Sequence, residues 1–240
     1  MQRNPITTAA AIMALAIILT GSIGVIGIFR MRSLSDTISV TGSAEQTVMS
    51  DVAKWTLQLT QSADLYNLET ANTAISADLG TLRAFLSERG IEPDWITVQP
   101  VSMNTNYDYN KGGTPSGYML MQTVVVEGND IEKIKSAAEN VNSLLNKGAL
   151  VSTMSLEYFY SGLQSIKQDI LAQATIDARE RARKMVEAAG SQLGSLRAAS
   201  MGVLQVTAVN SVEVSDYGMY DTSALEKKVT AVVRASFGIR

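Results

Sequence analysis

Hydrophobic positions along the chain follow two periods in turn, which predicts an alternation of strands and helices. Residues two apart are apolar over 38–40 and 51–61, as in strands with one buried face. Apolar residues three and four apart then run from Leu65 to Leu86, between the expected N-cap Asp64 and the stop Gly90, and predict a helix with one buried stripe. The other expected elements are strands over 96–103, 118–127, 151–160, 195–209 and 229–237, and helices over 129–148 and 163–189.

Several neighbouring strands are separated only by short turns, which indicates antiparallel pairing. The fold class expected is therefore α+β, with helices packed on a mainly antiparallel sheet. We expect 33–36 to be a linker and 37–240 to form this domain. In the last predicted helix the buried stripe narrows to Ala174, Ala178 and Ala182, which bury little area and therefore fit a place where another backbone packs very close.

The N-terminus holds a long apolar stretch. No charge interrupts the 26 residues from Asn4 to Phe29, and their dense part, 9–28, would make about 30 Å of helix, the thickness of a bilayer core. We interpret 1–32 as an uncleaved membrane anchor because a signal peptide, the alternative, has a shorter apolar stretch and a small-residue cleavage site. The anchor includes Ala9, Leu15, Leu19 and Ile28.

Small residues four apart within the anchor, namely Ala16, Thr20 and Gly24, are a candidate helix–helix contact, although ordinary membrane-helix composition explains them equally well. The positive charges on the two sides of the stretch, Arg3 before it and Arg30 and Arg32 after it, are nearly balanced and do not predict its orientation in the membrane. The simplest topology leaves the short tail in the cytoplasm and exports the rest. We therefore expect a single-pass protein of the bacterial inner membrane with its soluble domain in the periplasm, or a soluble periplasmic protein if the segment is cleaved.

The composition excludes several classes of catalytic and metal-binding site. The 240 residues include 20 Lys and Arg, 23 Asp and Glu, and neither Cys nor His, which excludes disulfides, thiol nucleophiles, Cys or His zinc sites and Ser-His triads. After residue 35 there are 17 basic and 23 acidic residues, so nucleic acid is not an expected partner. The loop carboxylates lack the spacing of a calcium loop, and we predict no metal, cofactor or catalytic residue.

Tyrosines gather at strand ends and in loops, where aromatic rings commonly make protein contacts; ordinary strand composition is the competing explanation. If the chain self-assembles, two loops and the alanine-lined helix are the candidate subunit contacts. Their residues are Tyr107, Tyr109, Tyr118, Ala174, Ala178, Ala182, Tyr217 and Tyr220.

Four sequence landmarks together resemble the SIMPL-domain family, the group that contains the bacterial periplasmic immunogenic protein and the oxidative-stress-defence protein. They are the opening Ser39-Val-Thr-Gly-Ser-Ala-Glu, Ile96-Thr-Val-Gln leading to Asn106-Tyr-Asp-Tyr, Gly117-Tyr118, and Ala174-Thr-Ile-Asp-Ala-Arg-Glu-Arg-Ala182. The resemblance covers about 39–237 and implies export, an α+β fold, homo-oligomers that are ring-like in some members, and a link to oxidative stress. It implies no catalytic residues.

We therefore expect an interaction protein and not an enzyme: a membrane-anchored, exported cell-envelope protein that forms a homo-oligomeric scaffold, with itself and the membrane as partners. Two alternatives stay open. One is a periplasmic binding or holdase module, which a large exposed apolar patch would support. The other is a carboxylate- or metal-dependent envelope hydrolase, which Asp and Glu side chains clustered in a pocket would support.

Overall fold

A computed structural model of the chain describes residues 13–14, 20–22, 36–213 and 215–240. Within these residues no helix is both long and apolar enough to cross a membrane. The anchor positions Ala9, Leu15, Leu19 and Ile28, and Ala16 and Gly24 of the small-residue contact, lie outside the described residues. Thr20 is described, as an exposed helical residue.

The chain forms two compact units where the sequence suggested one domain. The first unit contains the described residues up to Glu45, with Lys167–Leu204 and Thr230–Arg240; the second contains Gln46–Ile166 and Gln205–Val229. Chain connections therefore cross between the units several times, and a hydrophobic pattern read along the sequence cannot show the division.

The second unit is built on an antiparallel sheet with the strand order β3-β5-β2-β6, in which β4 also pairs with β5. When β3 and β4 are counted as one interrupted strand, its elements follow one another as strand–helix–strand–strand–helix–strand, the arrangement of ferredoxin-like folds. They are β2 (Val52–Ala63), α2 (Leu68–Glu88), β3 (Ile96–Val98), β4 (Ser102–Asp108), β5 (Thr114–Gly128), α3 (Ile131–Glu139) and β6 (Val151–Phe159), with short 3₁₀ turns at Pro93–Trp95, Tyr109–Lys111 and Val141–Lys147.

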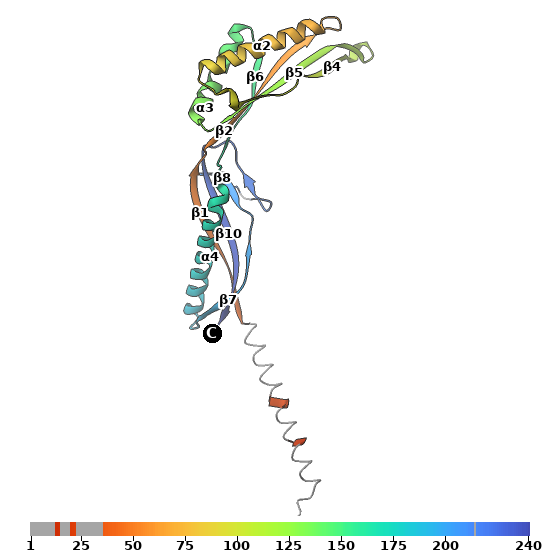
Figure 1. Ribbon diagram of the computed structural model, residues 1–240. Helices are drawn as coiled ribbons and strands as arrows, with labels where there is room; N and C mark the ends of the chain where they lie inside the picture. Colours follow the sequence, from red (N-terminus) through yellow and green to blue (C-terminus); the bar gives the residue numbers. More distant parts are fainter. Residues whose placement is uncertain (1–12, 15–19, 23–35, 214) are drawn as a thin grey trace, which may run out of the picture. The chain divides into compact units, whose positions relative to one another are not determined.

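The core of the second unit lies between this sheet and its helices. Alternate residues of β2, namely Trp55, Leu57 and Leu59, are fully buried on the face that α2 and α3 cover (Figure 1). Leu57 is opposite Val124 of β5, so the two strands contribute to the same apolar layer. The buried stripe of α2 completes it with Ile75, Leu82, Phe85 and Leu86. The expected α+β class with antiparallel pairing is confirmed, with one short parallel pair between β8 (Gln205–Ala208) and β9 (Met219–Tyr220).

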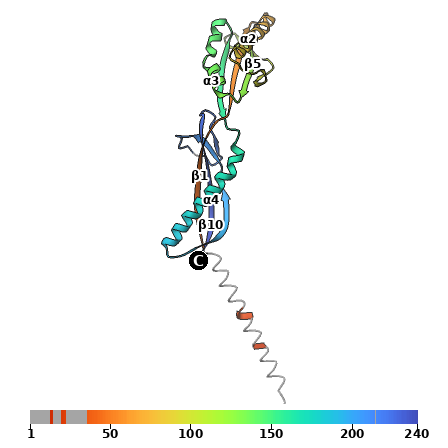
Figure 2. The same cartoon turned by 60° about the vertical axis from the view of Figure 1, so that its left-hand side comes forward.

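The first unit packs one long helix on a small sheet. Strand β10 (Glu226–Ile239) lies between β1 (Thr37–Met49) and β7 (Leu193–Met201), and α4 (Leu163–Ala188) runs along these strands in both views (Figures 1 and 2). The buried cluster between helix and sheet consists of Val40, Ala178, Ala182, Ala235 and Phe237.

Gly42 of β1 explains the alanine stripe. A Cβ at this position would overlap the carbonyl oxygen of Ala174 and the amide nitrogen of Ala178, and would lie 2.7 Å from the Ala178 Cβ. Strand and helix backbones therefore touch directly, which requires glycine on one side and alanine on the other. The expectation that the stripe faces a closely packed backbone is confirmed, and the backbone belongs to the same chain.

Asp177 of α4 stabilises the same contact between α4 and β1 through hydrogen bonds. Its carboxylate accepts hydrogen bonds from the Ser43 N–H of β1 at 2.9 Å and from the Arg181 guanidinium at 2.8 Å. These bonds, the one from Arg181 first, hold the pKa of Asp177 below its ordinary value. The opening landmark around Gly42 and Ser43 and the helical landmark around Asp177 are thus two halves of one packing contact.

Several predicted boundaries differ from the structure. Asp64 caps no helix: its carboxylate accepts the Tyr66 N–H in a turn, and α2 begins only after Asn67. The cap of α3 is Asp130, which accepts the Lys133 N–H, where we expected Asn129. Pro100 lacks the N–H that a ladder needs, and the strand expected over 96–103 is divided around it into β3 and β4. The helix expected over 163–189 is confirmed as Leu163–Ala188.

Candidate interaction surface

The β4–β5 hairpin carries exposed aromatic side chains. Tyr107 is 50% exposed and Tyr109 is 85% exposed. Between the strands the carboxylate of Asp108 accepts the Asn110 N–H at 3.0 Å, and Gly112 and Gly113 follow with φ of 73° each, a conformation that favours glycine. The turn is thereby fixed, and the two tyrosines extend from an ordered hairpin.

The loop before α2 starts beside this hairpin, because Ala63 pairs with Tyr118 and Asp64 lies against Gly117 of β5, and it exposes further apolar groups. Tyr66 is 93% exposed and Leu65 is 40% exposed. The Asp64 carboxylate holds the loop by accepting the Tyr66 N–H at 2.9 Å and the Asn67 side-chain amide at 2.7 Å. The hydrogen bond from the Tyr66 N–H is the main cause that lowers the pKa of Asp64, so this carboxylate stays charged at the edge of the surface.

A hollow of ≈ 580 Å³ separates the first turns of α2 from β4. The apolar stripe of α2 starts here at Leu68, which remains 36% exposed because β4 does not close the space beneath it. Met103 of β4 is 50% exposed at the opposite wall. The lining residues are Leu68, Glu69, Asn72, Val101, Met103 and Leu120.

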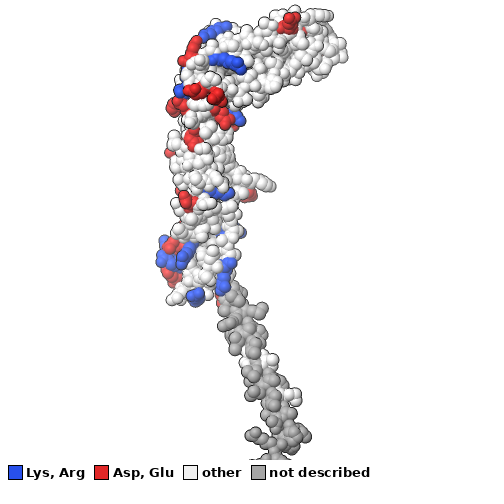
Figure 3. Space-filling view, in the orientation of Figure 1, with Lys and Arg blue, Asp and Glu red and all other residues white. Residues whose placement is uncertain are grey.

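Charge is scarce over this part of the second unit. From Trp95 to Val126 the sequence has two charged residues, Asp108 and Lys111. In Figure 3 the surface over the β4–β5 hairpin and the start of α2 is accordingly almost free of blue and red, apart from an acidic spot near its tip. We call the exposed set Leu65, Tyr66, Leu68, Val101, Met103, Tyr107 and Tyr109 the hairpin surface. Depletion of charge together with exposed Tyr and Met is typical of protein contact surfaces.

The other predicted contact tyrosines lie elsewhere. Tyr118 is half-buried opposite Thr105 and packs against the core. Tyr220 stacks on Phe159, with ring centroids 6.0 Å apart, and its hydroxyl accepts the Tyr160 N–H at 3.1 Å, so it holds its own loop. Tyr217 is 97% exposed. Of the predicted tyrosines, Tyr107 and Tyr109 belong to the hairpin surface.

Ala174, Ala178 and Ala182 have no exposed surface, because Gly42 and the sheet of the first unit cover them. Their contact area is used within one chain. These alanines therefore have no surface left with which to contact another copy.

Sequence reasoning missed Lys227, which is fully buried in the second unit. Its Nζ donates to the carbonyl oxygens of Asp221 at 2.5 Å and Ala224 at 2.7 Å. Burial lowers the pKa of Lys227, and the charge of Asp221 offsets only part of this effect. The sequence does contain an indication of this burial, because Lys227 has the same alternation as the inward positions of β10, which are 229, 231, 233, 235 and 237.

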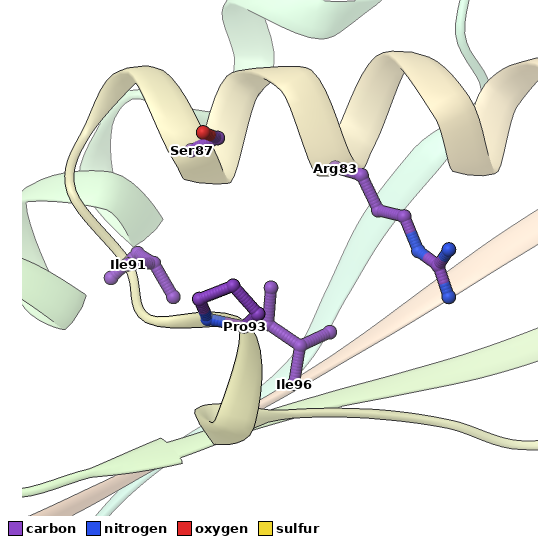
Figure 4. A pocket seen from close by; sticks show the side chains of 5 residues that line it. All are labelled: Arg83, Ser87, Ile91, Pro93 and Ile96. Carbon is purple, nitrogen blue, oxygen red and sulfur yellow. The ribbon is translucent and has the colours of Figure 1, made fainter.

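Other concave places offer little chemistry. Figure 4 shows a hollow of ≈ 370 Å³ lined by Arg83, Ser87, Ile91, Pro93 and Ile96, with the arginine as its one charged group. A hollow of ≈ 700 Å³ lies between α3, the 3₁₀ turn after it and β6. No group of three or more Asp or Glu side chains that could hold a metal occurs in the part of the chain that the structure describes.

Comparison with known proteins identifies the family of this chain. A family model described as "SIMPL: Protein of unknown function (DUF541)" matches residues 38–237. No curated protein matches the chain. The regulatory subunit of aspartate kinase from Thermus flavus is 14% identical over 82% of this chain and 89% of that one, with a TM-score of 0.19. A hydrolase from Listeria innocua is 9% identical over 82% and 92%, also with a TM-score of 0.19. At such TM-scores these likenesses carry no argument about fold or function.

Proposed function

The chain belongs to the SIMPL family, and from this premise we propose that it is a membrane-anchored protein of the bacterial cell envelope that acts by assembly with copies of itself, not by catalysis. The N-terminal stretch from Asn4 to Phe29 would hold it in the inner membrane, with the two units in the periplasm. A link to envelope or oxidative stress defence is part of the proposal and follows from the family resemblance alone.

The hairpin surface is the observation that carries the proposal. An isolated soluble chain gains nothing from exposing Tyr66, Met103, Tyr107 and Tyr109 together on a nearly uncharged area. Contact with another copy would remove these side chains from water. Such contact would also gather several anchors into one particle, and multivalent anchoring holds a particle on a membrane far more firmly than one anchor does.

The mass of the full-length protein extracted in mild detergent tests the proposal. We expect mass photometry at nanomolar concentration and light scattering at micromolar concentration to show particles of several chains. Tyr107→Asp introduces a charge at the hairpin surface and should raise the dissociation constant of the assembly at least ~10-fold, a change that corresponds to about 1.4 kcal/mol.

Tyr217→Asp is the matched control, because Tyr217 is also a highly exposed loop tyrosine but lies outside the hairpin surface. It should leave the mass distribution unchanged. A wild-type chain that is monomeric at micromolar concentration would refute the proposed assembly. Resistance of the full chain to alkaline carbonate extraction from membranes, with the N-terminal residues still present, tests the anchor separately.

A further inference from the structure

Strand β4 presents an open and unprotected edge. It pairs with β5 and with no other strand in the described part of the chain. Its seven residues, Ser102–Asp108, include neither lysine nor proline, and five of them are exposed. Natural proteins usually protect such edges, because the unpaired N–H and C=O groups accept a further strand.

Two other edge strands of the molecule, β6 and β1, are irregular or already hydrogen-bonded. In β6 the register shifts between Thr153 and Ser155, and the Tyr158 N–H donates to the Thr222 carbonyl at 2.7 Å. In the first unit, the edge strand β1 gives its Ser43 N–H to Asp177. Neither β6 nor β1 therefore offers the regular, unoccupied edge that β4 does.

The geometry of β4 is regular enough to accept a strand along its whole length. Its pairing with β5 has one irregularity, where Asn106 is opposite Gly117 and Tyr107 is opposite Pro115. The unpaired residue is Ser116, so the bulge lies in β5 and not in β4. Alternation then places Met103, Thr105 and Tyr107 on the helix-covered face of the sheet, and Asn104 and Asn106 on the other.

We propose that β4 pairs antiparallel with β4 of a second copy, in the register centred on Thr105. This inference rests on the proposed self-assembly and names its contact. Thr105 is the midpoint of Ser102–Asp108, so this register pairs all seven residues of each strand. Thr105 then meets Thr105, Asn104 meets Asn106, Met103 meets Tyr107, and Ser102 meets Asp108.

Each of these cross-strand pairs is chemically matched. Two β-branched residues meet on the axis, two amides can exchange hydrogen bonds, a thioether meets an aromatic ring, and a hydroxyl meets a carboxylate. The two Asp108 carboxylates lie at opposite ends, so no like charges oppose each other. This self-complementarity favours a second copy over an unrelated peptide. The symmetric contact joins two copies, and larger particles require a second, different contact between such pairs.

The hollow beside β4 fits the same register. Met103 forms part of its wall, together with Leu68 and Val101. The residue of the second copy opposite Met103 is Tyr107, whose ring would lie over the mouth of the hollow. Both hollows of the pair would be covered in this way, which removes exposed Leu68 and Met103 from water.

Absence of cysteine makes the register directly testable in the full-length, detergent-extracted chain. Paired residues of antiparallel strands have Cα atoms about 4.5–5.5 Å apart, within disulfide range. Under mild oxidation Thr105→Cys should form a covalent dimer at least ~10-fold faster than Met154→Cys, a control that is 60% exposed on β6. Asn104→Cys and Asn106→Cys should each cross-link slowly alone and rapidly when mixed.

Outcomes separate this inference from the assembly itself. If particles of several chains form but Thr105→Cys cross-links no faster than Met154→Cys, the β4 contact is rejected and the proposed assembly stands. If Asn104→Cys alone cross-links fastest, the register centred on Thr105 is rejected. If the wild-type chain is monomeric, both proposals are rejected. Circular dichroism of every variant checks that it is folded, and the Asn104→Cys and Asn106→Cys mixture provides a result independent of Thr105→Cys.

Discussion

The contact between Gly42 and α4 gives a sharp prediction for the substitution Gly42→Ala. The added Cβ would overlap backbone atoms of Ala174 and Ala178, and would lie 2.7 Å from the Ala178 Cβ. Carbon atoms in ordinary contact are about 3.5–4.0 Å apart. Helix and strand must therefore separate by roughly 1 Å, since neither backbone can move aside as a flexible side chain would.

Such a separation loosens the whole apolar cluster of the first unit. A gap of 0.5–1 Å forfeits about a quarter to a half of the dispersion energy of the contacts it opens. It also stretches the bond of 2.9 Å between the Ser43 N–H and Asp177. Overpacking of a well-packed core costs about 1–3 kcal/mol and a hydrogen bond to a charged group about 1.5–3 kcal/mol. We expect Gly42→Ala to lower the free energy of unfolding by about 3 kcal/mol.

Gly80→Ala is the matched control. Gly80 is exposed within α2, and a Cβ there would meet nothing within 4 Å. This substitution should stabilise the protein by about 0.5–1 kcal/mol, because alanine is the better helix former. Urea unfolding followed by circular dichroism measures both variants, and hydrogen exchange of 174–182 localises the effect. A Gly42→Ala variant within 0.5 kcal/mol of the wild type, with unchanged exchange in α4, would refute the reasoning.

Two further predictions concern charged groups. Lys227→Met leaves the carbonyls of Asp221 and Ala224 without their donor and should cost about 2–4 kcal/mol in urea unfolding. Because the pKa of Lys227 is lowered in the folded chain, the unfolded chain binds more protons in the pH range between that lowered pKa and 10.5. Wild-type stability should therefore rise relative to the variant as the pH approaches 10.5 from below, and equal slopes would contradict this. The lowered pKa of Asp177 stabilises the fold above pH 3.8 and is lost in stronger acid, so Asp177→Asn should flatten the acid transition, whereas the exposed control Asp216→Asn should not.

Part of the candidate site was predictable from local sequence. Tyr107 and Tyr109 stand beside a glycine turn, and the structure places both on the hairpin surface. The same reasoning also selected Tyr118 and Tyr220, which face a core and a stacking partner. Exposure of a loop tyrosine depends on segments distant in the sequence, and no local pattern reports them.

The sequence by itself determined the α+β class, the extent of α4 and the need for a close backbone opposite its alanines, because periodicity and residue size act over a few turns. Only the tertiary structure decided that this backbone is Gly42, that Lys227 is buried, and that β4 keeps an open edge. Those features arise from pairing between segments far apart in the chain. Strand neighbours and core partners are selected by the packing of the whole unit, since many alternative pairings satisfy the same local pattern.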